Sequence, residues 1–176
     1  ELGFGIDELI NIGNKIGADV GVCIEKKPMI MRGIGDVLSP SVLLPKKMNA
    51  ILVNPLLECS TPLVYKTYDE LGDFRYEFGF EYKDCMAFGD LIAMLKKQSN
   101  DLTNAAIKIC PDIFEILNFL ENETNASLVR MSGSGATCFA LYENKELSDF
   151  AADKINTHYK KMGKKLWAKS CCFLGE

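Results

Sequence analysis

Residues 128–142, LVRMSGSGATCFALY, decide the fold class of this chain. Two apolar runs, at 128–131 and 137–142, are rich in residues that favour β-strands. The glycine–serine segment 132–135 between them is typical of a short connection, and strands joined so closely pair antiparallel. The stretch therefore predicts two neighbouring strands of an antiparallel sheet.

Segments with helical periodicity surround this pair of strands. Apolar residues recur at helical spacing in three segments within 85–121 and again over 147–161, and 166–173 is typical of a last strand. Nearer the N-terminus the pattern predicts a helix ending near Gly17, an apolar turn at 20–24, and then a strand, a glycine-rich turn and a second strand over 28–36. It also predicts a strand at 50–53 and a helix over 63–68, with Ser60 as N-cap and Pro62 just inside its start. This order predicts an α+β fold, with an antiparallel sheet and helices on one face.

A proline-rich segment divides the chain into two expected domains. Pro40 and Pro45, with Lys46 and Lys47, flank an apolar break between two strand signals. We therefore expect a first unit over residues 1–45 and a second over residues 46–176. The length of 176 residues is compatible with one domain plus a remnant or with two small domains.

Composition and charge exclude several classes of protein. Apolar residues make up 48% and charged residues 25% of the chain, which is typical of a globular protein and not of a disordered one. The net charge of −4, without a long run of one sign, indicates neither nucleic acid nor an anionic membrane as a partner. With no membrane-length apolar stretch and no signal segment, we expect a cytoplasmic protein. The sequence is compatible with both a monomer and a homodimer.

The cysteines and the single histidine indicate no structural metal site. The chain has 7 cysteines, an odd number without C-x-x-C spacing, as expected for reduced thiols in the cytosol. His158 lies at helical spacing from Ala151 and Ile155, which predicts a buried or boundary position. Structural zinc needs clustered ligands and is therefore not expected.

Two segments have the residue types that chemistry needs. Small residues at 132–137 let backbone N–H groups approach an anion, although a plain glycine-rich hairpin is the simpler interpretation of the spacing alone. Asp19, at an expected helix start, would stay ionised and could accept a proton, although aspartate is also a common helix N-cap. Neither segment alone separates the two interpretations.

The order of five short motifs along the chain resembles one superfamily. The motifs are GADV at 17–20, MRGIG at 31–35, STP at 60–62, NDL at 100–102 and MSGSGAT at 131–137. Together they resemble the GHMP-type small-molecule kinases over residues 8 to about 170. Within that superfamily the chain is most similar to the branch that phosphorylates a cytidine diphosphate alcohol in the non-mevalonate route to isoprenoids.

The resemblance implies a role for each matching residue. Asp19 matches the base that receives the proton of the hydroxyl attacking the γ-phosphate of ATP. Thr61 and Tyr65 match a threonine and an aromatic residue of the cytidyl-substrate pocket, where an aromatic face can stack on cytosine. The glycine loop near the phosphates corresponds to Ser132, Gly133, Ser134 and Gly135, whereas Asn100 is expected to be structural. ATP and Mg²⁺ are the implied cofactors, with no protein metal ligand assigned.

The chain also departs from the superfamily pattern. The lysine-bearing strand motif and the phosphate loop Pro-x-Gly-Ala-Gly-Leu-Gly-Gly-Gly-Ser-Ser are absent. Gly21 stands where proline usually follows Asp-Val, which should loosen a turn beside Asp19. We therefore expect a C-terminal piece, in which 1–45 is the end of the ATP and substrate domain, that does not turn over ATP alone because the triphosphate lacks its cradle.

Two other functions stay open at this point. Another kinase of the superfamily, acting on homoserine, mevalonate or a sugar, would share the glycine loop and the aspartate, but Tyr65 and the Ser-Thr-Pro spacing argue against it. A non-catalytic binding module would keep the fold of residues 46–176 and lack the kinase activity.

Overall fold

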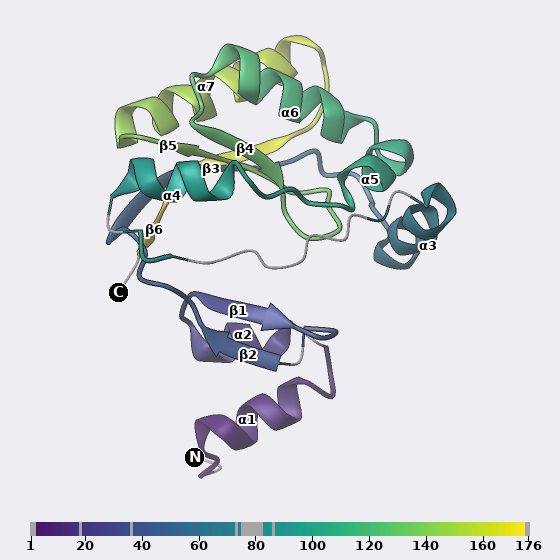
Figure 1. The fold of residues 1–176 in the computed structure, drawn as a ribbon. Coiled ribbons are helices and arrows are strands. Elements are labelled where there is room, and N and C mark those ends of the chain that lie inside the picture. The colour runs from purple at the N-terminus through teal and green to yellow at the C-terminus, as the bar shows by residue number, and fades with distance from the viewer. Residues whose placement is uncertain are drawn as a thin grey trace.

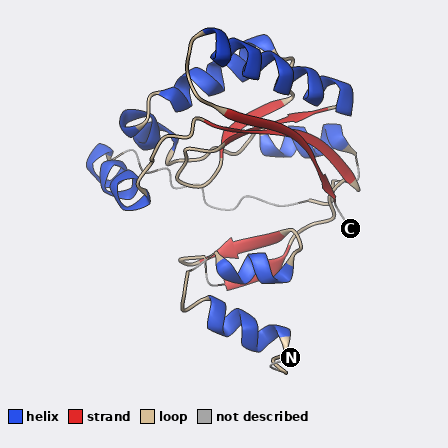
Figure 2. Cartoon of the chain, turned by 180° about the vertical axis from the view of Figure 1, so that it is seen from behind, coloured by secondary structure: helices blue, strands red, loops and turns tan. Residues whose placement is uncertain are grey.

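The computed structural model describes residues 3–17, 19–35, 37–72, 74, 83–85 and 87–174. These residues form a four-stranded sheet with helices around it and, nearer the N-terminus, a two-stranded sheet with two helices (Figure 1). The view from behind shows the same two groups of elements, joined by the segment that follows the two-stranded sheet (Figure 2).

The four-stranded sheet is antiparallel throughout, as the sequence predicts. Its strands are β3 (Lys47–Asn54), β4 (Leu128–Met131), β5 (Cys138–Tyr142) and β6 (Trp167–Leu174), in the spatial order β4-β5-β3-β6. Ile51 at the middle of β3 is paired with Ala140 on one side and Ser170 on the other. The glycine-rich segment 132–135 therefore connects two paired strands, β4 and β5, at one end of the sheet.

One face of this sheet carries the main hydrophobic core. It is covered by α6 (Asp112–Glu123) and α7 (Lys145–Lys161), while α3 (Thr61–Leu71) and α5 (Thr103–Ile109) pack beside one end (Figure 1). The fully buried side chains here include Ile51, Ile113, Tyr142 and Ile155. The α+β class is confirmed.

The opposite face carries a smaller core under α4 (Phe88–Leu95). Ile92 packs with Ala50, Leu128 and Leu141, which alternate along their strands with residues of the main core. Helices therefore lie on both faces, where the sequence analysis expected one. The reason is that the strands carry apolar residues in successive positions, so both faces of the sheet need cover.

Residues 3–40 form the smaller group of elements. It consists of α1 (Ile6–Gly13), α2 (Val20–Glu25), β1 (Met29–Arg32) and β2 (Val37–Pro40), and the two strands pair antiparallel across a glycine turn as expected. The division of the chain into 1–45 and 46–176 stays a prediction.

The apolar segment expected to be a turn is instead the helix α2. A Cβ atom on Gly21 would lie 2.6 Å from Asn14 Oδ1, and one on Gly13 would lie 2.8 Å from Val20 Cγ1. The two glycines therefore let α1 and α2 approach closely, and this packing compensates for the low helix propensity of the segment. Gly21 lies inside a packed helix, so it does not loosen a turn beside Asp19.

His158 is exposed on α7, which contradicts its expected buried or boundary position. The buried position of that turn is taken by Tyr159, four residues after the buried Ile155. All seven cysteines are free thiols, and three of them are buried. None of the helices in the described part of the chain has the length and apolarity that crossing a membrane requires.

Candidate active site

The start of α3 lies against the glycine loop, defined here as residues 132–135. Ser60, in extended conformation, precedes the helix, and Pro62 in the first turn favours a helix start. This places Thr61 at the first helical position, where its Oγ1 atom is 2.7 Å from Ser134 Oγ. Two segments that the sequence singled out separately are thus joined by a hydrogen bond.

The glycine loop has a tight backbone that its sequence permits. Gly133 has a φ of 55° and Gly135 a φ of 87°, a region that favours glycine. The Ser132 N–H donates to Thr137 O at 2.8 Å, and the Gly135 N–H donates to Ser132 O at 3.0 Å. A Cβ atom on Gly135 would lie 3.1 Å from Ile113 Cδ1, so the loop rests directly on α6.

Three side chains from other parts of the chain hold the glycine loop and the residues next to it in place. Asn100, just before α5, donates from Nδ2 to Met131 O at 3.0 Å and to Gly133 O at 2.8 Å. The Cys59 thiol donates to Ser134 O at 3.4 Å, and Asn54 Nδ2 donates to Thr137 Oγ1 at 2.9 Å. The sequence analysis expected a structural Asn100 and missed Cys59 and Asn54, for which no local motif gives a signal.

Tyr65 lies on the same face of α3 as Thr61, since residues four apart in a helix are neighbours. Its side chain is 53% exposed, so the ring is accessible to a planar ligand. Stacking on a base and hydrogen bonding at Thr61 could therefore act on one ligand.

Asp19 lies at the N-cap position of α2, as one of the two interpretations of the sequence expected. Its carboxylate makes no capping hydrogen bond and is exposed. Among the contacts of the described residues, none joins Asp19 to Thr61, Tyr65 or the glycine loop. The structure therefore brings together α3 and the glycine loop, and it leaves Asp19 on the smaller group of elements.

An apolar cavity of about 570 Å³ connects the two groups of elements. Met29 and Met31 line it from β1, and Phe139 and Leu141 line it from β5. Ser132 of the glycine loop also lies on its wall. The cavity thus extends from β1, near the smaller group's core, to the edge of the glycine loop.

The thiols behind the glycine loop are kept protonated. Burial raises the pKa of Cys59, with a smaller contribution from Cys110, and burial raises the pKa of Cys138 to about 12. A thiol with a raised pKa is a poor nucleophile. These cysteines therefore contribute packing and weak hydrogen bonds to this region.

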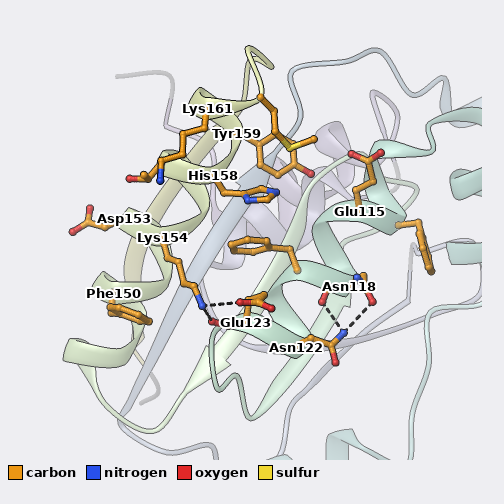
Figure 3. A pocket seen from close by; sticks show the side chains of 14 residues that line it. Glu115, Asn118, Asn122, Glu123, Phe150, Asp153, Lys154, His158, Tyr159 and Lys161 are labelled. Carbon is orange, nitrogen blue, oxygen red and sulfur yellow. Dashed lines mark hydrogen bonds and ion pairs between the residues drawn. The ribbon is translucent and has the colours of Figure 1, made fainter.

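A second hollow, of about 820 Å³, lies between α6 and α7 and was not expected from the sequence (Figure 3). Across it, Lys154 Nζ of α7 donates to Glu123 Oε2 of α6 at 2.9 Å, and this hydrogen bond lowers the pKa of Glu123. The rings of Phe119 and His158 lie against each other with centroids 4.7 Å apart. None of the residues lining this hollow belongs to the candidate active site.

Comparison with known proteins identifies the class to which this fold and loop belong. Residues 80–161 match the family described as GHMP kinases C terminal. Over this segment the chain is similar to the C-terminal domain of the GHMP kinases, which agrees with the resemblance that the five motifs indicate.

Individual proteins with similar sequences show which kinases of this class the chain is similar to. The chain is 39% identical over 149 residues to 4-diphosphocytidyl-2-C-methyl-D-erythritol kinase of Paramagnetospirillum magneticum, a match that covers 85% of this chain and 51% of the relative. The chain spans about half the length of the curated relatives it matches.

Solved structures agree with this placement. The crystal structure of a 4-(cytidine 5'-diphospho)-2C-methyl-D-erythritol kinase matches 96% of this chain and 57% of its own, with a TM-score of 0.65 at 26% identity. The homoserine kinase of Cytophaga hutchinsonii matches 98% of this chain and 59% of its own, with a TM-score of 0.58 at 12% identity, and shows a shared fold.

Proposed function

We propose that this chain serves the ATP-dependent phosphorylation of the 2-hydroxyl of 4-diphosphocytidyl-2-C-methyl-D-erythritol, a step of isoprenoid synthesis. The observation that carries the proposal is the hydrogen bond between Thr61 and Ser134, because it joins the expected substrate segment to the expected phosphate loop. The relatives' names and the similarity over most of the chain support this substrate over homoserine or mevalonate.

The reaction assigns one step to Asp19. The substrate hydroxyl oxygen attacks the γ-phosphorus, the bond between this phosphorus and the bridging oxygen of ADP breaks, and the hydroxyl proton passes to the Asp19 carboxylate. The exposure of this carboxylate and its freedom from a capping bond support the role, since it can reach a ligand without first losing a partner. Because Asp19 makes no contact with the glycine loop, the substrate must span the distance between them.

Thr61 and Tyr65 would select the nucleotide part of the substrate. The Tyr65 ring would stack on the cytosine, and the Thr61 hydroxyl would orient a polar group of the same ligand. Both side chains are exposed on the first turns of α3, which fits this function. The rigid start of the helix and the bond to Ser134 would keep Thr61 in place.

The glycine loop fits the phosphates of ATP in its backbone conformation. Small residues with positive φ present N–H groups without side chains in the way, which suits an anion. ATP supplies the phosphoryl group when bound. Within the described residues no cluster of three His, Cys, Asp or Glu side chains is suited to a metal ion, so Mg²⁺ would be held mainly by the phosphates.

The domain division belongs to the same proposal. Residues 1–45 would contribute Asp19 and β1 to a first domain, and residues 46–176 would form the second, with the apolar cavity between them. The lysine-bearing strand motif and the phosphate loop Pro-x-Gly-Ala-Gly-Leu-Gly-Gly-Gly-Ser-Ser are absent from these 176 residues. The chain by itself is therefore expected to release no ADP.

A chimera tests the proposal. This chain would replace the matching half of the Paramagnetospirillum magneticum kinase, and ADP release would be measured with ATP, Mg²⁺ and 4-diphosphocytidyl-2-C-methyl-D-erythritol. The proposal expects turnover by the chimera, none by the 176 residues alone, and little with homoserine or mevalonate. A folded chimera that turns over none of the three alcohols would favour a binding module.

A further inference from the structure

The side-chain amide of Asn100 forms hydrogen bonds on both of its sides, through its nitrogen and through its oxygen. Its Nδ2 group donates to Met131 O at 3.0 Å and to Gly133 O at 2.8 Å, while its Oδ1 atom accepts from the Leu102 N–H at 3.0 Å. The two acceptors on one side and the donor on the other fix the orientation of the amide. Asn100 thus ties Leu102, the N-cap residue of α5, to the glycine loop.

Four carbonyl groups, those of Met131 at the end of β4 and of Ser132, Gly133 and Ser134 in the glycine loop, accept hydrogen bonds from protein donors. Asn100 Nδ2 donates to the carbonyl oxygens of Met131 and Gly133. The Gly135 N–H donates to Ser132 O, and the Cys59 thiol donates to Ser134 O. Four successive carbonyl oxygens, from residues 131–134, are therefore occupied by the protein itself.

The direction of these carbonyl groups matters for an anion. A carbonyl oxygen carries partial negative charge and repels phosphate, whereas the N–H groups of a compact glycine turn attract it. Without the Asn100 donors, rotation of the peptide plane after Gly133 would cost little, because glycine tolerates a wide range of backbone angles, whereas the plane after Met131 would still be held by the Ser132 N–H bond to Thr137 O. The Gly133 oxygen could then turn outward and oppose an anion.

We propose that Asn100 is a positioning residue, which holds the carbonyl group of Gly133 and that of the preceding Met131 inward and thereby sets the affinity of the glycine loop for the phosphates of a nucleoside triphosphate. The inference rests on the proposed kinase function and adds to it a residue that touches neither substrate nor nucleotide. It replaces the purely structural role that the sequence suggested for Asn100.

The first test uses the 176-residue chain without any ligand. Asn100→Asp keeps an oxygen that can accept from the Leu102 N–H and loses both Nδ2 donor bonds. The variant therefore separates the bond to Leu102 from the two bonds to the Met131 and Gly133 carbonyls. We expect amide hydrogen exchange at Ser132 and Gly135 to become about tenfold faster, the effect of roughly one net hydrogen bond. Asn100→Ala serves as the second variant in case the new carboxylate prevents folding.

Asn156→Asp is the matched control for the exchange measurement. Asn156 Nδ2 also donates to a backbone carbonyl, Ala168 O at 3.1 Å, but it joins α7 to β6. Exchange at Ser132 and Gly135 should change by less than about twofold in this variant. Unchanged loop exchange in both Asn100 variants would overturn the proposal, even if their overall stability falls.

The second test measures kinetics in the chimera with the same variants. We expect the KM for ATP to rise about tenfold in Asn100→Asp, with the KM for the acceptor alcohol within about twofold of its starting value. A fall in kcat with both KM values unchanged would contradict a role at the phosphates. If the parent chimera is inactive, the kinase function fails and the exchange result still decides whether Asn100 holds the loop.

Discussion

The Thr61 hydroxyl lies 2.7 Å from the Ser134 hydroxyl, although the two residues are 73 positions apart in the chain. This contact links the first residue of α3 to the middle of the glycine loop. Both hydroxyl groups are uncharged, so a neutral hydrogen bond joins the two segments. A displacement of α3 would therefore break this hydrogen bond or shift the glycine loop with the helix.

A double-mutant cycle should detect this contact. Thr61→Val and Ser134→Ala each remove it, so the two changes together should cost less than their sum, with a coupling of about 0.5 kcal/mol in the free energy of unfolding at this partly exposed site. Denaturant unfolding of the four proteins measures the coupling. The exposed Thr157 on α7 gives the control, since Thr157→Val should add to Ser134→Ala without coupling.

Asp19→Asn should abolish turnover without affecting folding. Loss of the proton acceptor is expected to lower kcat in the chimera roughly 10²- to 10⁴-fold. The free energy of unfolding should stay within about 0.5 kcal/mol, because the side chain is exposed and makes no capping bond. Asp7→Asn, also exposed on the smaller group of elements, should leave kcat unchanged. Full turnover in Asp19→Asn would rule out this residue as the base.

The two glycines of the loop should differ in their tolerance of alanine. Gly133→Ala meets no atom within 4 Å and carries only the backbone penalty of about 1 kcal/mol. Gly135→Ala adds contacts at 3.1 Å with Ile113 Cδ1 and Met131 Sδ, so a destabilisation of about 2 kcal/mol or more is expected. Thermal unfolding compares the two variants. Equal losses would mean that the loop can move away from α6.

The buried pair Thr124 and Tyr142 should respond asymmetrically to substitution. Thr124 Oγ1 donates to Leu120 O at 2.5 Å and accepts from the Tyr142 hydroxyl at 2.7 Å. Tyr142→Phe leaves Thr124 bonded and should cost about 1 kcal/mol, whereas Thr124→Val strands a buried phenol and should cost about 2 kcal/mol. Chemical denaturation decides the order, and the reverse order would contradict this hydrogen-bond assignment.

Two buried tyrosines should make the fold sensitive to alkali. Burial raises the pKa of Tyr142 and of Tyr159 to about 12 each, above the value of about 10 in an unfolded chain. Below pH 10 both states are protonated, and above it the unfolded state loses protons first. The free energy of unfolding should therefore fall between about pH 10 and pH 12.

Tyr159→Phe isolates one of the two contributions to this loss. Its hydroxyl is buried without a hydrogen-bond partner among the described residues, so removing it should leave stability at pH 7 unchanged or slightly higher. The decline above pH 10 should become shallower in this variant. Unfolding measured across pH checks both effects, and a decline equal to that of the parent would exclude Tyr159 as a source.

Strongly patterned segments made much of the fold predictable from sequence. The strand signals at 128–131 and 137–142, separated by a glycine segment, gave the hairpin between β4 and β5 almost to the residue. Ser60 and Pro62 placed the start of α3 to within two residues, since the helix begins at Thr61 instead of the expected Leu63. Such signals work because they depend on local backbone chemistry.

The features that sequence missed depend on tertiary packing. The helix α2 forms because Gly21 packs against α1, and no local propensity reports that neighbour. Cys59 contacts Ser134 of the glycine loop from 75 residues away, and Asn54 contacts Thr137, just after the loop, from 83 residues away. Thr61 and Ser134 were each chosen by motif, but their contact is a property of the folded chain.

The central position of β3 sets the order in which the chain can fold during synthesis. Its two neighbours, β5 and β6, are both encoded after it, and β5 begins more than 80 residues later. At the usual pace of translation those residues take roughly 4–16 s to appear. The edges of β3 must wait unpaired for that time, so the nascent chain exposes a strand of its future core to chaperones and to other nascent chains before the sheet can close.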